Sequence, residues 1–214
     1  MTNSTQKWLN QLSERYMILN WRRPFYVFVD LEATCWEGAC PFDYKRQEVI
    51  EIGAVFTNGD FDELSHFASF VRPAHNTTLT EFCTKLTGIT QSAVDEAPTF
   101  GEVFFDFLNW LPESRTMTCF ASWGDYDWKG LRFDCEVSAI DFKGETFGMQ
   151  HVNIKKRVKK WCLSKNHFHK SWNLGHVAIE HGLILPGKQH RALNDARAAV
   201  MVVKDIGDEI FNFD

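Results

Sequence analysis

The clearest hydrophobic signal in the chain is an apolar run from Phe25 to Val29, which continues as Asp30-Leu31-Glu32. A run of this kind is typical of a strand that is buried on both faces. Residues two apart on a strand point to the same side, so the two carboxylates share one small volume. Their repulsion calls for a compensating cation, most simply a divalent metal ion. The alternative is a pair of solvated carboxylates at a frayed strand end.

Three further apolar segments have the length and the β-branched content of strands. They span residues 47–56, 64–71 and 116–122. Asn58-Gly59-Asp60 predicts a tight turn between the first two, which would complete a meander with the strand at residues 25–32.

Apolar residues at helical spacing predict the remaining elements. A short helix and lead-in is expected within residues 1–24, and a single domain over residues 25–214. The other predicted helices span residues 79–86, 99–111, 127–136, 152–161, 173–182 and 192–211, with a short turn starting at Thr90. This order of elements predicts an α/β architecture with a mixed sheet.

Composition and charge narrow the class of protein. A chain of 214 residues fits one domain, and its net charge of −5 argues against a generally nucleic-acid-coating polycation. The run KKRVKK from Lys155 to Lys160 is either a solvated helix face or a phosphate contact. No apolar run reaches the roughly 18 residues of a membrane helix, and the N-terminus lacks the apolar core of a secretory signal. Six cysteines without a CxxC pair predict a reduced, cytoplasmic protein.

Further carboxylates follow a later strand and open the last helix. SWGDYD brings Asp125 and Asp127, and HRALND brings His190 and Asp195. Sites in open α/β sheets gather at the carboxyl ends of central strands, where Asp30, Glu32 and the SWGDYD segment would lie. His190 and Asp195 converge only if the histidine precedes the helix, since five residues of helix turn through about 500°. Taken singly, Asp125 has the position of an N-cap and His190 that of a solvated loop residue.

Together these segments resemble the DEDD 3′–5′ exonucleases of the ribonuclease-H-like fold, in the branch with a catalytic histidine. The nearest subgroup is that of the Eri-type exonucleases and their KapD-like bacterial relatives. The resemblance is carried by VDLEATC, EVIEIGAV, FVRPAHNTTLTEFCTKLTGIT, SWGDYD and HRALNDA, and it covers nearly the whole chain after residue 24. It implies a mixed five-stranded sheet flanked by helices and a metal-dependent 3′–5′ exonuclease activity.

The resemblance also implies roles for single residues. Asp30 and Glu32 match the metal ligands of the first motif, and His190 and Asp195 match the base and the ligand of the third. The second motif pairs an aromatic residue with Asp and has an apolar residue four positions later. Tyr126-Asp127 with Leu131 fits this spacing and Asp125 does not, so Asp127 is the expected ligand. The SWG segment departs from relatives that carry Asn or His there.

The residue types suit this chemistry. Four carboxylates are hard oxygen ligands of the kind that Mg²⁺ or Mn²⁺ prefers. Two such ions about 4 Å apart clamp the attacking and leaving oxygens of a phosphodiester. A histidine, with an ordinary pKa near 6.5, is suited to take the proton of the attacking water. The expected products are nucleoside 5′-monophosphates.

The expected partner is the 3′ end of a single-stranded nucleic acid, RNA in preference to DNA. No single side chain in the sequence indicates that the 2′-hydroxyl is read. Trp36 is expected either to stack on a terminal base or to pack under its own loop. Phe82 and Leu86 fall in a region that the family uses near the 3′ nucleotide, although their helical spacing favours the core for Phe82. The remaining candidate substrate contacts are Ala33, Thr34 and Trp123.

Three other interpretations remain open. A regulatory protein that keeps the fold without turnover would bind a nucleic acid or a protein. A glycosidase would use a carboxylate pair and no metal. A zinc site built from His151, Cys162, His167 and His169 has a spacing that matches no standard ligand pair.

Overall fold

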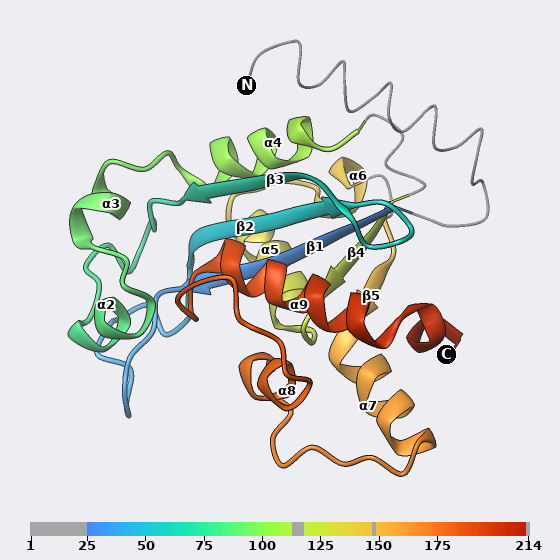
Figure 1. Cartoon of the computed structure of the whole chain (residues 1–214). Helices are drawn as coiled ribbons and strands as arrows, with labels where there is room; N and C mark the ends of the chain where they lie inside the picture. Colours follow the sequence, from blue (N-terminus) through green and yellow to red (C-terminus); the bar gives the residue numbers. More distant parts are fainter. Residues whose placement is uncertain (1–24, 113–117, 147–148, 213–214) are drawn as a thin grey trace.

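A mixed sheet of five strands forms the centre of the molecule, as the family resemblance implies (Figure 1). The computed structural model describes residues 25–112, 118–146 and 149–212, so the helix expected within residues 1–24 lies outside the described residues. The strand order is β3-β2-β1-β4-β5, with β2 antiparallel to β1 and β3, and β4 and β5 parallel to β1. The strands are β1 (Phe25–Ala33), β2 (Val49–Thr57), β3 (Glu63–Phe70), β4 (Thr118–Ser122) and β5 (His151–Asn153).

Strand β1 is central, and its two sides face different helix layers. Val27, Val29 and Leu31 pack with the apolar residues of α4 (Phe100–Trp110) and α5 (Tyr126–Val137). Tyr26 and Phe28 pack on the other side with α7 (Ile154–Ser164), α8 (Leu174–Glu180) and α9 (Ala192–Ile206). Because side chains alternate along a strand, Asp30 and Glu32 belong to the side that α9 covers.

Helix α9 approaches the sheet at Gly53 of β2. A Cβ atom at Gly53 would lie 2.1 Å from the backbone nitrogen of Leu193 and 2.2 Å from the carbonyl carbon of Ala192. No side chain fits between these backbones. Gly53 therefore allows the first residues of α9 to pack directly against the backbone of β2. The same contact brings the first turn of α9 over the carboxyl end of β1.

Short helices complete the outer parts of the molecule. Thr80 and Thr90 cap α2 (Glu81–Thr87) and α3 (Gln91–Asp95) through their hydroxyls, and Gly88 ends α2 in the left-handed conformation, as predicted. The others are α6 (Phe142–Glu145) and the 3₁₀ helix η2 (Asp208–Asn212). None of the helices in the described part of the chain has the length and apolar character that a membrane crossing requires.

Two predicted helix boundaries are wrong. The helix expected from residue 152 begins at Ile154, because residues 151–153 pair with Phe120 to Ser122 as strand β5. The helix expected to reach residue 211 ends at Ile206. Gly207 takes a φ of 87°, which leaves the helical conformation, and η2 follows.

Candidate active site

The five residues expected to carry chemistry line one cavity of about 260 Å³ at the carboxyl end of β1. Asp30 and Glu32 come from β1, and Asp127 comes from the first turn of α5. His190 precedes α9 and Asp195 lies in its first turn. Three segments far apart in sequence therefore bring four carboxylates and an imidazole into one space.

The two β1 carboxylates lie in a strongly acidic environment. Burial, together with repulsion from the nearby Asp195, Glu51 and Asp127, raises the pKa of Glu32 to about 8. Burial, followed by repulsion from Asp127, Asp195 and Glu32, raises the pKa of Asp30 well above its ordinary value. Each carboxylate is thus costly to ionise beside the others, which is the condition that a bound cation relieves.

The second-motif carboxylate in the cavity is Asp127. Its side chain is 5% exposed, and its Oδ1 accepts a hydrogen bond from the backbone N–H of Leu31 at 3.2 Å. Burial raises its pKa to about 7 even though this hydrogen bond lowers it. Asp125 is exposed and does not line the cavity; its Oδ1 accepts a hydrogen bond from Asn153 Nδ2 at 2.8 Å. Asp125 occupies the N-cap position of α5, but its side chain makes no cap hydrogen bond.

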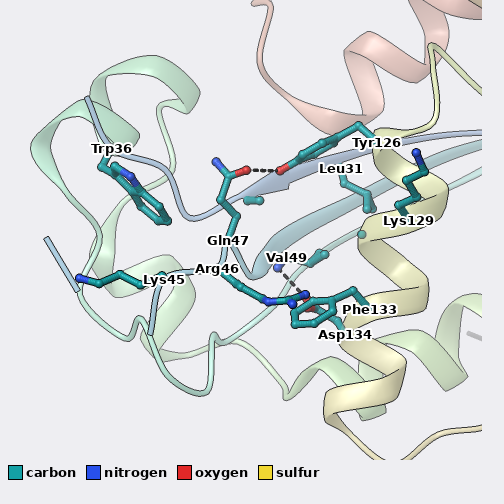
Figure 2. A pocket seen from close by; sticks show the side chains of 12 residues that line it. Leu31, Trp36, Lys45, Arg46, Gln47, Val49, Tyr126, Lys129, Phe133 and Asp134 are labelled. Carbon is teal, nitrogen blue, oxygen red and sulfur yellow. Dashed lines mark hydrogen bonds between the residues drawn. The ribbon is translucent and has the colours of Figure 1, made fainter. Parts of the chain in front are cut away.

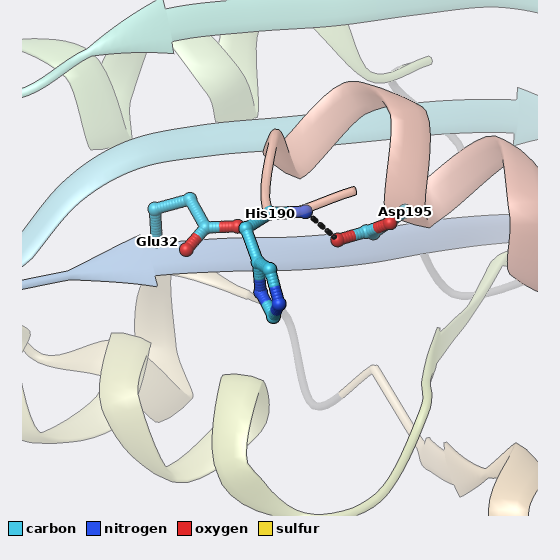
Figure 3. A group of neighbouring side chains, drawn as sticks. All are labelled: Glu32, His190 and Asp195. Carbon is cyan, nitrogen blue, oxygen red and sulfur yellow. Dashed lines mark hydrogen bonds between the residues drawn. The ribbon is translucent and has the colours of Figure 1, made fainter. Parts of the chain in front are cut away.

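His190 lies before α9, the position that allows it to meet Asp195 (Figure 3). Its backbone N–H donates to Asp195 Oδ2 at 2.8 Å, and its φ of 59° turns the chain sharply at this point. One ligand atom each from Glu32, His190 and Asp195 lies within 4.8 Å of the other two. Burial also raises the pKa of Asp195, while the hydrogen bond from His190 lowers it.

An ion pair between the buried Glu51 and the half-buried Arg191, beside the cavity, was not predicted from the sequence. Glu51 lies opposite Glu32 in the register of β1 and β2, and its side chain is 4% exposed. It accepts hydrogen bonds from Arg191 Nη2 at 2.8 Å and from the backbone N–H of Ala192 at 3.1 Å. The signal was a glutamate inside the apolar run EVIEIGAV, and its partner directly follows His190. The pair fixes the backbone at the junction of His190 and α9.

The donor set fits a hard divalent cation. The four carboxylates supply oxygen donors. Burial is the largest cause of the raised pKa values of Asp30, Glu32, Asp127 and Asp195, and repulsion from neighbouring carboxylates adds to it, so a bound cation would relieve a cost that the four share. Oxygen donors in this number favour Mg²⁺ or Mn²⁺ over ions that prefer nitrogen or sulfur.

A second cavity of about 570 Å³ adjoins the first, and both share Leu31 and Tyr126 as wall residues (Figure 2). Ala33 and Trp36 line it, and the Tyr126 hydroxyl donates to Gln47 Oε1 at 2.9 Å across it. Its basic residues are Lys45, Arg46 and Lys129. The half-buried Trp36 meets Phe42 of its own loop edge to face, with ring centroids 5.8 Å apart.

The other candidate substrate contacts differ in position. Trp123 lines the carboxylate cavity, and its indole N–H donates to the carbonyl of Trp172 at 3.0 Å. Thr34 is buried, and its hydroxyl accepts the backbone N–H of Glu48, so its side chain supports the loop. The expectation that Phe82 lies in the core is wrong, because it is 38% exposed on α2. Neither Phe82 nor Leu86 lines the carboxylate cavity.

The structure does not assemble the zinc set considered from sequence. His151 Nε2 lies 2.9 Å from the Ser122 hydroxyl, and the imidazole stacks on Trp128. Burial lowers the pKa of His151. His167 and His169 do lie together, but in the connection between α7 and α8.

Comparison with known proteins identifies the family. The family model described as "Exonuclease" (RNase_T) matches residues 27–203. The chain belongs to this exonuclease family. It is 31% identical over 195 residues to the 3′-5′ exoribonuclease 1 of Rattus norvegicus, covering 85% of this chain and 53% of the rat protein. It is 28% identical over 210 residues to the 3′-5′ exonuclease eri1 of Schizosaccharomyces pombe, covering 89% and 70%.

The fold comparison agrees with the sequence comparison. The nuclease domain of 3′hExo, a DEDDh family member bound to rAMP, superimposes with a TM-score of 0.74 at 26% identity. The match covers 86% of this chain and 92% of that domain. The expected Eri-type DEDDh family and ribonuclease-H-like sheet are therefore confirmed. The chain spans about half the length of the rat relative.

Proposed function

We propose that this exonuclease-family chain hydrolyses phosphodiester bonds from the 3′ end of single-stranded nucleic acid or of a 3′ overhang, one nucleotide at a time. It releases nucleoside 5′-monophosphates and prefers RNA to DNA. The observation that carries the proposal is the convergence of Asp30, Glu32, Asp127, His190 and Asp195 on one cavity. The name of the rat relative, 3′-5′ exoribonuclease 1, supports the RNA preference.

Each side chain has a role that follows from its position. The four carboxylates would hold two Mg²⁺ or Mn²⁺ ions, which when bound would supply positive charge for the phosphate and for the attacking and leaving oxygens. His190 is exposed at the mouth of the cavity, where its imidazole takes the proton of the attacking water. The exposed imidazolium then releases this proton to solvent and returns to the neutral form, while Asp30 and Glu32 stay fixed on β1.

In this proposal, the adjoining cavity binds the 3′-terminal nucleotides of the nucleic acid. Single-stranded nucleic acids bind through stacking on aromatic rings and through basic side chains that follow the backbone. Trp36 and Tyr126 offer rings, and Lys129 offers a charge, next to the wall that both cavities share. The six free cysteines accord with a protein that acts in the reducing cytoplasm.

The test is digestion of matched RNA and DNA duplexes with labelled 3′ overhangs, with Mg²⁺ and separately with Mn²⁺, resolved on a gel. The wild-type chain should shorten the RNA overhang stepwise, and chelation by EDTA should stop the reaction. Asp30→Ala should abolish shortening and His190→Ala should slow it about 10²- to 10⁴-fold, while circular dichroism and thermal unfolding show a folded protein. Unchanged activity in both variants would refute the assigned chemistry.

The same experiment separates the enzyme from a regulatory binding protein. A wild-type chain that binds the oligonucleotide tightly but never shortens it, with either metal ion, would identify a protein that keeps this fold only for binding. Activity that persists in EDTA would point instead to metal-independent acid–base chemistry.

A further inference from the structure

The connection between α7 and α8 lies in the lower part of Figure 1. Three histidines of this connection and of the end of α8 lie close together. The ring centroids of His167 and His169 are 4.7 Å apart, and those of His169 and His181 are 5.3 Å apart. The third distance, between His167 and His181, is 6.4 Å. Imidazoles that share one tetrahedral ion, with Zn–N bonds of about 2.0–2.1 Å, have ring centres about 5 Å apart.

The two inner histidines are already oriented by carboxylates. His169 Nδ1 pairs with Glu180, and His181 Nδ1 lies 2.8 Å from Asp205 Oδ2. Histidines that bind metal ions commonly use one ring nitrogen for the ion and the other for such a carboxylate. Both Nδ1 atoms are therefore occupied, and each ring presents Nε2 as its remaining donor.

These two Nε2 atoms are buried and have no hydrogen-bond partner among the described residues. The His169 side chain is 0% exposed, so solvent does not reach it. Burying a polar nitrogen without a partner is costly, and native proteins rarely leave two together. Each of these two nitrogen atoms calls for a partner, and since the two rings are neighbours, one metal ion or one bridging water molecule could serve both.

We propose that His169 and His181, joined by His167, bind one transition-metal ion of the Zn²⁺ class at a site separate from the carboxylate cavity. Imidazole donors select such ions, whereas the carboxylate cavity suits Mg²⁺ or Mn²⁺. Among the described residues, the one group of three with ligand atoms within 4.8 Å of one another lies in the carboxylate cavity. The third imidazole therefore completes the new site by turning inward, which the exposed position of His167 permits.

The ion would fasten the α7–α8 connection to the end of α8. Trp172 lies in that connection and meets His169 edge to face, with ring centroids 5.0 Å apart. Its carbonyl accepts the indole N–H of Trp123, a wall residue of the carboxylate cavity. The metal site would therefore stabilise the position of Trp123 through Trp172, without contacting the reacting atoms.

The experiment titrates Zn²⁺ into untagged protein that has been stripped with a chelator and then given excess Mg²⁺. Isothermal calorimetry should show one equivalent of bound Zn²⁺, and the thermal unfolding temperature should rise. His169→Gln and His181→Gln should each lose that equivalent. Asp205→Asn, which removes only the orienting carboxylate, should weaken Zn²⁺ binding about 10- to 100-fold.

Two controls locate the ion. His66→Gln removes an exposed histidine that also pairs with a carboxylate, Glu63, and Asp30→Asn alters the carboxylate cavity. Both should keep the Zn²⁺ equivalent. If the buried substitutions do not fold, His167→Gln tests the site from the surface and should weaken binding at least tenfold. Absence of a Zn²⁺ equivalent in the wild type, or full binding in His167→Gln, would overturn the proposal and leave a bridging water.

Discussion

The two halves of the carboxylate cavity are held in place by different means. Asp30 and Glu32 stand on the central strand, which is paired on both sides by β2 and β4. His190 stands in an exposed segment after Gly187, in a left-handed conformation, and a short set of polar contacts fixes it. The strand half depends on the sheet, whereas the histidine half depends on how α9 begins.

This difference predicts which part of the carboxylate cavity keeps its geometry when a residue is substituted. Strand pairing and burial hold β1 even when a carboxylate is changed, and removing one charge relieves repulsion. The histidine segment has few such contacts: the hydrogen bond from His190 N–H to Asp195 and the pair between Glu51 and Arg191. Substitutions in the first half should alter chemistry without loss of the fold, and substitutions near the second should alter geometry.

The largest expected effect is that of Glu32→Gln. Loss of this carboxylate removes cation binding worth several kcal/mol, so nucleotide release should fall about 10³-fold or more. His190→Ala removes only the proton acceptor and should cost about 10²- to 10⁴-fold. The readout that separates them is the rise in unfolding temperature on adding Mn²⁺, which Glu32→Gln should reduce and His190→Ala should keep. Equal Mn²⁺ stabilisation in both variants would contradict the division of roles.

Glu51→Gln should have the next largest effect. It leaves Arg191 without its full countercharge and loosens the backbone at His190, so kcat should fall about 10- to 100-fold with KM nearly unchanged. Glu63→Gln is a matched control, because Glu63 binds Arg197 through two hydrogen bonds at a more exposed position on β3. It should change kcat less than about twofold. A similar loss in both variants would mean that the Glu51 effect is only one of stability.

The sequence predicted the strand half better than the histidine half for a physical reason. The period of a strand is local, so Asp30 and Glu32 could be placed on one side of β1 before any tertiary contact was known. The Glu51–Arg191 pair joins residues 140 apart and depends on the β1–β2 register and on the close approach of α9 to Gly53. Neither is encoded in a short window of sequence.

Two other errors have the same origin. Strand β5 has only three residues and forms through pairing with β4, so its own apolar pattern is too short to distinguish it from helix. The helical spacing around Phe82 indicated a core face, but the sheet covers only part of α2. The family's second motif indicated Asp127 by its spacing from Tyr126 and Leu131, and Asp127 is the carboxylate of this segment that lines the cavity.

Stability without metal ions should fall as the pH rises. The pKa of Glu32 is raised from 4.5 to about 8, so between these values the folded chain holds a proton that the unfolded chain has released. The free energy of unfolding in EDTA should therefore decrease from about pH 5 to pH 8, by up to about 1.4 kcal/mol per pH unit for one such group. In chemical denaturation, saturating Mg²⁺ should flatten this dependence, and the Glu32→Gln substitution should reduce it, since Asp30, Asp127 and Asp195 keep raised pKa values. A stability that rises with pH in EDTA would show that the carboxylates are not crowded in solution.

The smallest expected effects distinguish the basic residues of the second cavity from the basic run Lys155 to Lys160 on α7. Lys129 lines the cavity next to Tyr126, whereas Lys156 is exposed on α7 and lines neither cavity. Neighbours of Lys156 within its basic run are engaged in packing: Arg157 donates to the carbonyl of Phe211, and Lys159 lies over the Trp172 ring. Lys129→Ala should raise KM a few-fold and reduce the salt dependence of log KM by about 0.7, the contribution of one phosphate contact on a single strand. Lys156→Ala should change KM less than about twofold and should leave the salt dependence of log KM unchanged. If Lys156→Ala has the larger effect, the bound nucleic acid runs along α7, and the run from Lys155 to Lys160 contacts its phosphates.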